Sequence, residues 1–398
     1  MNIMDDLSSP APFTIAAPQL FDGTALRGPA LVTVASGHIG DISFTGALPA
    51  GAIALPPDTI LSPGFIDIQV NGGGGVLLND EPTEAGIRRI VAAHRKYGTT
   101  GLLPTLITDR AEVMERLAES AAAALQIPGV LGFHLEGPAL NKTRKGIHLE
   151  SEIRAPDARD LAAITSFAGR GRSLVTLAPE CVPPALIGDL VHAGLRVAAG
   201  HSDATAAQIR QAADRGLTGV THLFNAMSQL NARAPGVVGA ALDEDRLFAG
   251  IICDGLHVDP VSLRLASRCK GRDRLMLVTD AMALVGTELR HFLLQGREIT
   301  LEDGRLTGPD GTLAGAHLSM IDAVRNAVAW LGIGLADALA MASRTPATFL
   351  GLERECGAIA PGYRADLVAF NSGFEVVETW VGGRSSQSAA SQEGEVSS

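Results

Sequence analysis

The sequence has few basic residues and no run of them. Lys and Arg number 32 against 43 Asp and Glu, which gives a formal net charge of −11 over 398 residues. Without a basic run, a nucleic acid or an anionic membrane surface is a poor candidate for a partner. A small anionic substrate stays compatible with this charge, provided that a local group of cations holds it.

Cysteine is scarce, and long apolar segments are missing. The four cysteines have no C-x-x-C spacing, which disfavours a disulfide framework or a zinc knuckle and is typical of thiols in a reducing compartment. No apolar run reaches the ~18 residues of a membrane span. The N-terminal stretch MNIMDDLSSP has neither the basic nor the apolar region of a secretory signal. We therefore expect a cytoplasmic protein.

The length and the composition of the chain predict one large domain and a smaller one. The chain is longer than a usual single core, and 46% of its residues are hydrophobic. Short β segments broken by Gly and Pro fill residues 13–60, and β character returns in residues 356–385. These two parts predict a small β-sandwich domain built from both chain ends. Residues 1–12 and 386–398 are small and polar, which predicts flexible termini.

Between these parts, residues 61–355 alternate apolar segments with amphipathic ones. The stretches 84–98 and 204–216 carry apolar residues near a 3.6-residue period and each ends at a glycine, as helices do. Eight such strands with intervening helices predict an α/β fold, a closed (β/α)8 TIM-like barrel, with a doubly wound open sheet as the alternative. A hairpin over 292–313 and helices over 318–331 and 334–350 should follow. The eight predicted strands cover residues 60–69, 99–106, 130–136, 173–180, 195–201, 218–224, 247–253 and 274–280.

Polar residues stand at the ends of four predicted strands: Glu136, His201, His222 and Asp280. Taken singly, each has an ordinary explanation, such as a hydrogen-bonded core histidine or a carboxylate that caps a turn or helix. In a (β/α)8 barrel, however, the carboxyl ends of the strands meet at one mouth. Two imidazoles and a carboxylate that meet there form a ligand set of catalytic zinc.

The motifs around these residues occur in a recognisable order. They are PGFIDIQVNGGGG (63–75), HLEGPALNKTRKGIH (134–148), AGHSDAT (199–205), THLFNAMSQLNARAPGVVGA (221–240), GIICDGLHVD (250–259), LVTDAM (277–282) and GAIAPGYRADLVAF (357–370). Together they resemble the amidohydrolase superfamily and, within it, the N-acetylglucosamine-6-phosphate deacetylase family. The resemblance covers most of the chain.

The resemblance implies a role for each residue at the mouth. Glu136, His201 and His222 match the family's ligands of one divalent ion per subunit, with zinc leading and iron, cobalt or manganese as alternatives. Asp280 matches the acid/base that takes a proton from the attacking water and returns it to the departing amine. His148 matches the residue that polarises the acetyl carbonyl.

The resemblance also implies a substrate site. The phosphate is expected beside Asn225, Ala226, Arg233 and His257, with Arg233 reaching the site of a partner subunit in a homodimer. The remaining substrate contacts match Ala139, Leu140, Leu318 and Ser319.

These matches predict deacetylation of N-acetylglucosamine 6-phosphate to glucosamine 6-phosphate and acetate, in amino-sugar catabolism or recycling. Three alternatives stay open. The galactosamine epimer could be the substrate, since the orientation of one hydroxyl cannot be read from the residues. Another amidohydrolase activity, such as a cyclic amidase or aminohydrolase, fits the phosphate motifs poorly. A non-catalytic barrel fits poorly with the presence of all four polar residues at the mouth.

One stretch departs from the wider superfamily. Many members carry His-x-His after the first barrel strand, where this chain has Gln69 and Asn71. Neutral amide oxygens bind zinc-like ions poorly beside imidazole or carboxylate. The departure predicts a single ion, with Gln69 and Asn71 as polar neighbours of the site.

Overall fold

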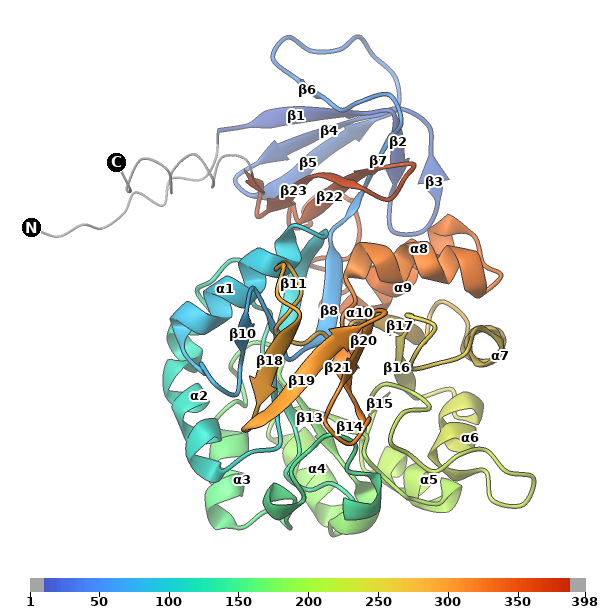
Figure 1. The fold of residues 1–398 in the computed structure, drawn as a ribbon. Coiled ribbons are helices and arrows are strands. Elements are labelled where there is room, and N and C mark those ends of the chain that lie inside the picture. The colour runs from blue at the N-terminus through green and yellow to red at the C-terminus, as the bar shows by residue number, and fades with distance from the viewer. Residues whose placement is uncertain (1–10, 387–398) are drawn as a thin grey trace, which may run out of the picture.

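The computed structural model describes residues 11–386, and a barrel of eight parallel strands lies below a smaller β domain in the view of Figure 1. Most of both predicted flexible termini, residues 1–10 and 387–398, lies outside the described residues. Each of the eight predicted strand segments contributes one strand to the barrel, and these strands follow one another around the sheet in chain order. They are β8 (Phe65–Val70), β11 (Thr99–Ile107), β12 (His134–Glu136), β13 (Leu174–Leu177), β14 (Arg196–Ala199), β15 (Gly219–Val220), β16 (Phe248–Ile252) and β17 (Leu275–Val278).

The barrel closes where the segment after β17 meets β8. The backbone N–H of Asp280 donates to the carbonyl of Gln69 at 3.0 Å, and that of Asn71 donates to Ala281 at 2.9 Å. A buried carboxylate strengthens this seam, since Thr279 donates its hydroxyl to Oδ2 of Asp67 at 2.5 Å. The closed barrel is therefore confirmed, and the open doubly wound sheet is wrong.

Helices cover the outside of the barrel (Figure 1). The stretch 84–98 folds as predicted, with Thr83 capping the helix start and Gly98 at a φ of +87° after its end. No helix within residues 11–386 has the length and apolar character to cross a bilayer. The helices of this layer are α1 (Glu84–Arg95), α2 (Ala111–Ala124), α3 (Ala158–Thr165), α4 (Pro184–His192), α5 (Ala206–Asp214), α6 (Gly236–Asp243) and α7 (Pro260–Lys270).

The small β domain consists of two sheets, as predicted, and contains both ends of the described chain. Strand β7 (Thr59–Pro63) pairs antiparallel with β22 (Leu367–Asn371), which joins the two ends in one sheet. Apolar residues from both sheets, among them Ile15, Val32 and Trp380, form a separate core. The other strands are β1 (Phe13–Ala17), β2 (Gln19–Phe21), β3 (Leu26–Arg27), β4 (Ala30–Ala35), β5 (His38–Ser43), β6 (Ile53–Ala54), β23 (Val376–Val381) and β24 (Arg384–Ser385).

The single strand predicted over 60–69 is wrong, because the structure has two strands there. The chain leaves the small domain at the end of β7, and β8 enters the barrel directly after Gly64. A side chain at this crossing would collide with the barrel, since a Cβ on Gly64 would lie 1.9 Å from Oγ1 of Thr100. The apolar run is continuous because both strands are buried, so hydrophobicity alone could not reveal the break.

The chain after β17 also differs from the prediction. In place of one hairpin, four antiparallel strands form a meander: β18 (His291–Leu294), β19 (Arg297–Glu302), β20 (Arg305–Thr307) and β21 (Leu313–Ala316). Strand β21 lies at the barrel mouth, where Ala316 N–H donates to the carbonyl of Asp280 at 2.9 Å. The helix α8 (Met320–Trp330) follows. The helix predicted over 334–350 is broken at Ser343 into α9 (Leu335–Ala342) and α10 (Arg344–Leu350).

Candidate active site

A cavity of about 350 Å³ opens at the carboxyl ends of the barrel strands. The four strand-end residues of the sequence prediction all line it, together with His148 from the segment after β12. Segments after several strands and the meander complete the wall. The other lining residues are Asn71, Ile107, Thr143, Arg144, Gly146, Ile147, Asn225, Ala226, His257, Met282, Thr312, Leu313 and Gly315.

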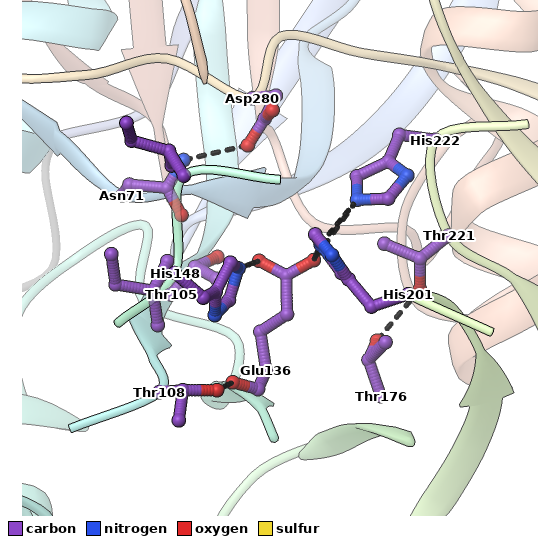
Figure 2. A network of polar contacts seen from close by, with 12 residues as sticks. Asn71, Thr105, Thr108, Glu136, His148, Thr176, His201, Thr221, His222 and Asp280 are labelled. Atoms are coloured by element: carbon purple, nitrogen blue, oxygen red, sulfur yellow. Dashed lines mark hydrogen bonds and ion pairs between the residues drawn. The ribbon is translucent and has the colours of Figure 1, made fainter. Parts of the chain in front are cut away.

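Three polar groups converge at the floor of this cavity (Figure 2). Oε1 of Glu136 lies 3.1 Å from Nε2 of His222 and 3.2 Å from Nε2 of His201. The two imidazole nitrogens lie 3.1 Å from each other. The three atoms thus form a nearly equilateral triangle, and all three residues are buried.

The triangle has the donor chemistry that a divalent cation needs. Nδ1 of His201 donates to the carbonyl of Arg144 at 2.8 Å, so in the neutral ring Nε2 carries a lone pair that faces the triangle. Ligand atoms at ~2.1 Å from a tetrahedral ion lie roughly 3.4 Å apart, close to the separations seen here. Two imidazoles and one carboxylate fit zinc-like ions, so these residues could hold one.

A second combination of ligands is also within reach. Glu136, His148 and His201 offer three atoms within 4.8 Å of one another. Nε2 of His148 is 3.8 Å from Oε2 of Glu136, however, which is longer than either contact in the first triangle. The closer set contains His222 in place of His148, and it leaves His148 free for another task.

Burial and charge shape the electrostatics of this floor. Burial disfavours the ionised form of Glu136, but the adjacent imidazoles of His201 and His222 hold the pKa of its carboxyl well below its usual range. Burial lowers the pKa of His148 to about 3, so this ring is neutral at physiological pH. For Asp280, burial and the charge of Glu136 both raise the pKa of the carboxyl.

Asp280 is held beside the triangle by two side-chain amides. Its Oδ1 accepts from Nδ2 of Asn71 at 2.6 Å and from Nε2 of Gln69 at 3.1 Å. The same Gln69 amide lies 3.4 Å from Oε1 of Glu136. Gln69 and Asn71 are therefore polar neighbours of the site, as predicted.

Three of these residues have backbones in the left-handed region. The φ angles are +48° for His201, +31° for His222 and +51° for Asp280. A non-glycine residue adopts this region at a cost, and such residues concentrate at functional sites. Each stands just beyond the carboxyl end of a barrel strand, so the turn aims the side chain into the mouth.

The remaining predicted site residues include some that line the cavity and others that do not. Asn225, Ala226 and His257 line the cavity, and Nδ1 of His257 is 2.6 Å from Oδ2 of Asp254. Arg233 is exposed on the loop before α6 and does not line the cavity. Four further residues are buried and are also absent from the cavity wall: Ala139, Leu140, Leu318 and Ser319.

The sequence prediction did not single out two polar residues of the barrel interior, His134 and Asp67. His134 donates from Nδ1 to the carbonyl of Ile68 at 3.0 Å, and its Nε2 is 2.7 Å from Thr176. Asp67 holds the seam described above. Side chains two residues apart on a strand share a face, so His134 shares that of Glu136, and Asp67 that of Gln69. The alternation of side chains along these strands could therefore have pointed to both residues.

Comparison with known proteins decides the family. The sequence profile of the amidohydrolase family matches residues 60–385. The chain belongs to the amidohydrolase family. It is 42% identical to an N-acetylgalactosamine-6-phosphate deacetylase of Shewanella sp. (strain ANA-3), over 80% of this chain and 81% of that protein. It is 36% identical to the N-acetylglucosamine-6-phosphate deacetylase of Haemophilus influenzae, over 81% of this chain and 86% of that protein.

Solved structures of this amidohydrolase's relatives agree with its fold. The N-acetylglucosamine-6-phosphate deacetylase of Pasteurella multocida superposes with a TM-score of 0.90 at 35% identity, covering 94% of this chain and 99% of that one. A mutant of the Mycobacterium smegmatis deacetylase, in complex with N-acetylglucosamine 6-phosphate, reaches 0.88 at 33% identity over 94% and 99% of the two chains. The barrel and the small β domain are thus a shared architecture.

Proposed function

We propose that this amidohydrolase removes the acetyl group from N-acetylglucosamine 6-phosphate and releases glucosamine 6-phosphate and acetate. One observation carries the proposal: a buried triangle of Glu136, His201 and His222 faces Asp280 in one cavity, in a chain whose relatives are deacetylases. A water must be activated and an amide nitrogen must be protonated in this reaction, and the cavity offers groups for both.

The triangle is proposed to hold one divalent ion, with zinc as the leading candidate and iron, cobalt or manganese as alternatives. When bound, such an ion supplies Lewis acidity for the attack of water on the amide. Glu136 provides the negative charge of the site, and its burial makes that charge costly unless a cation or cationic group faces it.

The protein's own groups complete the reaction. Asp280 accepts a proton from the attacking water and later delivers it to the amine that leaves, so one carboxylate serves both steps. Neutral His148 has an N–H available to hydrogen-bond the acetyl oxygen as negative charge develops on it. The amides of Gln69 and Asn71 keep Asp280 oriented beside the reacting atoms.

The phosphate is proposed to bind at the outer wall, near Asn225, Ala226 and His257. Arg233 is exposed and away from its own cavity, which supports a homodimer in which it reaches the partner subunit's site. The four buried residues that match the family's further substrate contacts would act from behind the cavity wall; they are Ala139, Leu140, Leu318 and Ser319. A cytoplasmic location is part of the same proposal.

One observation favours a second candidate substrate. Identity to the Shewanella N-acetylgalactosamine-6-phosphate deacetylase is 42%, against 36% for the Haemophilus glucosamine enzyme. The two substrates differ in the orientation of one hydroxyl, and the amide chemistry is the same. The galactosamine epimer is therefore the alternative within the same mechanism.

The test is a deacetylation assay of both N-acetylated amino-sugar 6-phosphates with metal-reconstituted protein. We expect acetate release from the glucosamine substrate and a large loss of kcat/KM when the 6-phosphate is absent. Elemental analysis after dialysis should give about one equivalent of metal per chain, and His201→Ala or His222→Ala should remove it. Activity on neither epimer, or two tightly held equivalents, would contradict the proposal.

A further inference from the structure

The backbone of His201 needs support from its surroundings. This residue follows strand β14 with a φ of +48°, and only its imidazole reaches the triangle. A bulky residue stays in this region when neighbouring contacts determine its conformation. The following residue, Ser202, is fully buried, so its polar groups must find hydrogen-bond partners within the protein and not in solvent.

A single carboxylate, that of Glu180, contacts the two residues after His201. Glu180 lies in the short 3-10 helix after β13, Pro179–Cys181. Its Oε2 accepts from the hydroxyl of Ser202 at 2.7 Å, and its Oε1 accepts from the backbone N–H of Asp203 at 2.6 Å. Glu180 is not among the residues that line the cavity, so it acts on the site only through other residues.

The same carboxylate also holds the loop on the other side of His201. Oε1 of Glu180 accepts from Nδ2 of Asn141 at 2.9 Å, at the start of the loop that carries Arg144 and His148. The backbone N–H of Asn141 donates to the carbonyl of His201 at 2.9 Å. The carbonyl of Arg144 in turn accepts from Nδ1 of His201.

We propose that Glu180 is a positioning residue that joins these two loops and thereby holds the His201 imidazole in its metal-binding orientation and tautomer. The inference rests on the proposed metal centre. A salt bridge of 2.8 Å between Arg144 and Asp203 links the two loops again at the surface, but both side chains are substantially exposed. Solvent weakens that link, so the partly buried Glu180 carries the connection.

The first test is the affinity for Zn²⁺, measured by chelator competition. Glu180→Ala leaves the buried hydroxyl of Ser202 and the N–H of Asp203 without their acceptor, and we expect a roughly 10- to 100-fold loss of affinity. Glu180→Gln should stay within about threefold of the wild type, because its carbonyl oxygen still accepts from Asn141 and Asp203 and its amide can donate to the hydroxyl oxygen of Ser202. Ser202→Ala removes one contact only and should fall between them.

The matched control is Asp22→Ala in the small β domain. Asp22 accepts from the backbone N–H and hydroxyl of Thr24 at 2.7 and 2.6 Å, so its contacts are of the same kind as those of Glu180. This variant should lower the melting temperature while Zn²⁺ affinity is unchanged.

Two results would overturn the inference. One is Zn²⁺ affinity within about twofold of the wild type in Glu180→Ala, or in Ser202→Ala if Glu180→Ala does not fold. The other is an equal loss of affinity in Asp22→Ala, which would reduce the effect to general destabilisation. A wild-type protein that binds no Zn²⁺ would instead refute the proposed metal centre, so the two failures are distinguishable.

Discussion

Asn71 and Asp280 are linked by a hydrogen bond of 2.6 Å between the amide Nδ2 and the carboxylate Oδ1. Gln69 contacts the same oxygen, and neither amide contacts Oδ2. Both donors therefore orient the carboxylate by Oδ1, which leaves Oδ2 as the oxygen that would exchange the proton in the proposed reaction. Gln69 and Asn71 thus orient the residue that we propose as the acid/base.

This relationship predicts the effect of Asn71→Ala. Loss of a hydrogen bond to a charged group costs on the order of 1.5–3 kcal/mol, so kcat should fall at least roughly tenfold while metal content is unchanged. The matched control is Asn79→Ala, which removes an amide donor 2.9 Å from Asp109, away from the cavity floor. Steady-state kinetics of both variants check the prediction, and an equal fall in kcat in both would contradict it.

Asp280→Asn should fold and bind metal but lose nearly all turnover. The substitution preserves shape and removes the proton transfer, which contributes ~10²–10⁴-fold to such reactions. Measurement of kcat together with metal content separates this outcome from loss of the ion. Turnover like that of the wild type would exclude Asp280 from the mechanism.

Asp67 should make the stability of the protein fall as the pH rises. Burial raises its pKa to about 7, whereas the unfolded chain has the ordinary aspartate value near 3.9. Between these two values the folded protein retains a proton that the unfolded chain has lost, so unfolding becomes easier with increasing pH. Over the whole window this amounts to about 4 kcal/mol, of which roughly 3 kcal/mol falls between pH 5 and 8.

Asp67→Asn is the variant that isolates this effect. Asparagine resembles the protonated carboxyl in shape and in having no charge, and its oxygen can accept from Gln69 N–H as the Asp67 side chain does. Urea unfolding of both metal-free proteins at pH 5 and pH 8 gives the comparison. We expect the wild type to lose roughly 3 kcal/mol more than the variant. An equal loss in both would show that Asp67 is ionised in the folded protein.

Arg233→Ala should weaken binding of the phosphorylated substrate and leave the unphosphorylated analogue almost unaffected. Loss of a charge-assisted phosphate contact costs on the order of 1.5–3 kcal/mol, which is roughly a 10- to 150-fold rise in KM. Arg116, another exposed arginine without a carboxylate partner among the described residues, supplies the control variant. Equal effects of Arg233→Ala on both substrates would mean that it does not contact phosphate.

Much of the barrel could be predicted because its signals are local. Apolar strands alternate with amphipathic helices, and the polar residues that end four strands converge once the sheet closes. The errors lie where local signals are weak. The break at Gly64 joins two equally buried strands, and the turn at Ser343 interrupts a continuous helical pattern. The prediction placed one hairpin where the structure has a four-stranded meander, because short strands joined by glycine turns permit several pairings.

The sequence by itself determined the alternation of strands and helices, the family, and which residue types stand at the strand ends. Only the tertiary structure decided which of them meet. Glu136, His201 and His222 come from three strands, and their triangle depends on the left-handed turns that follow two of those strands. The contacts of Glu180 with Ser202 and of Asp67 with Thr279 likewise join residues distant in the chain. Such contacts leave no periodic trace, because they arise from the pairing of strands and the closure of the barrel and not from any single segment.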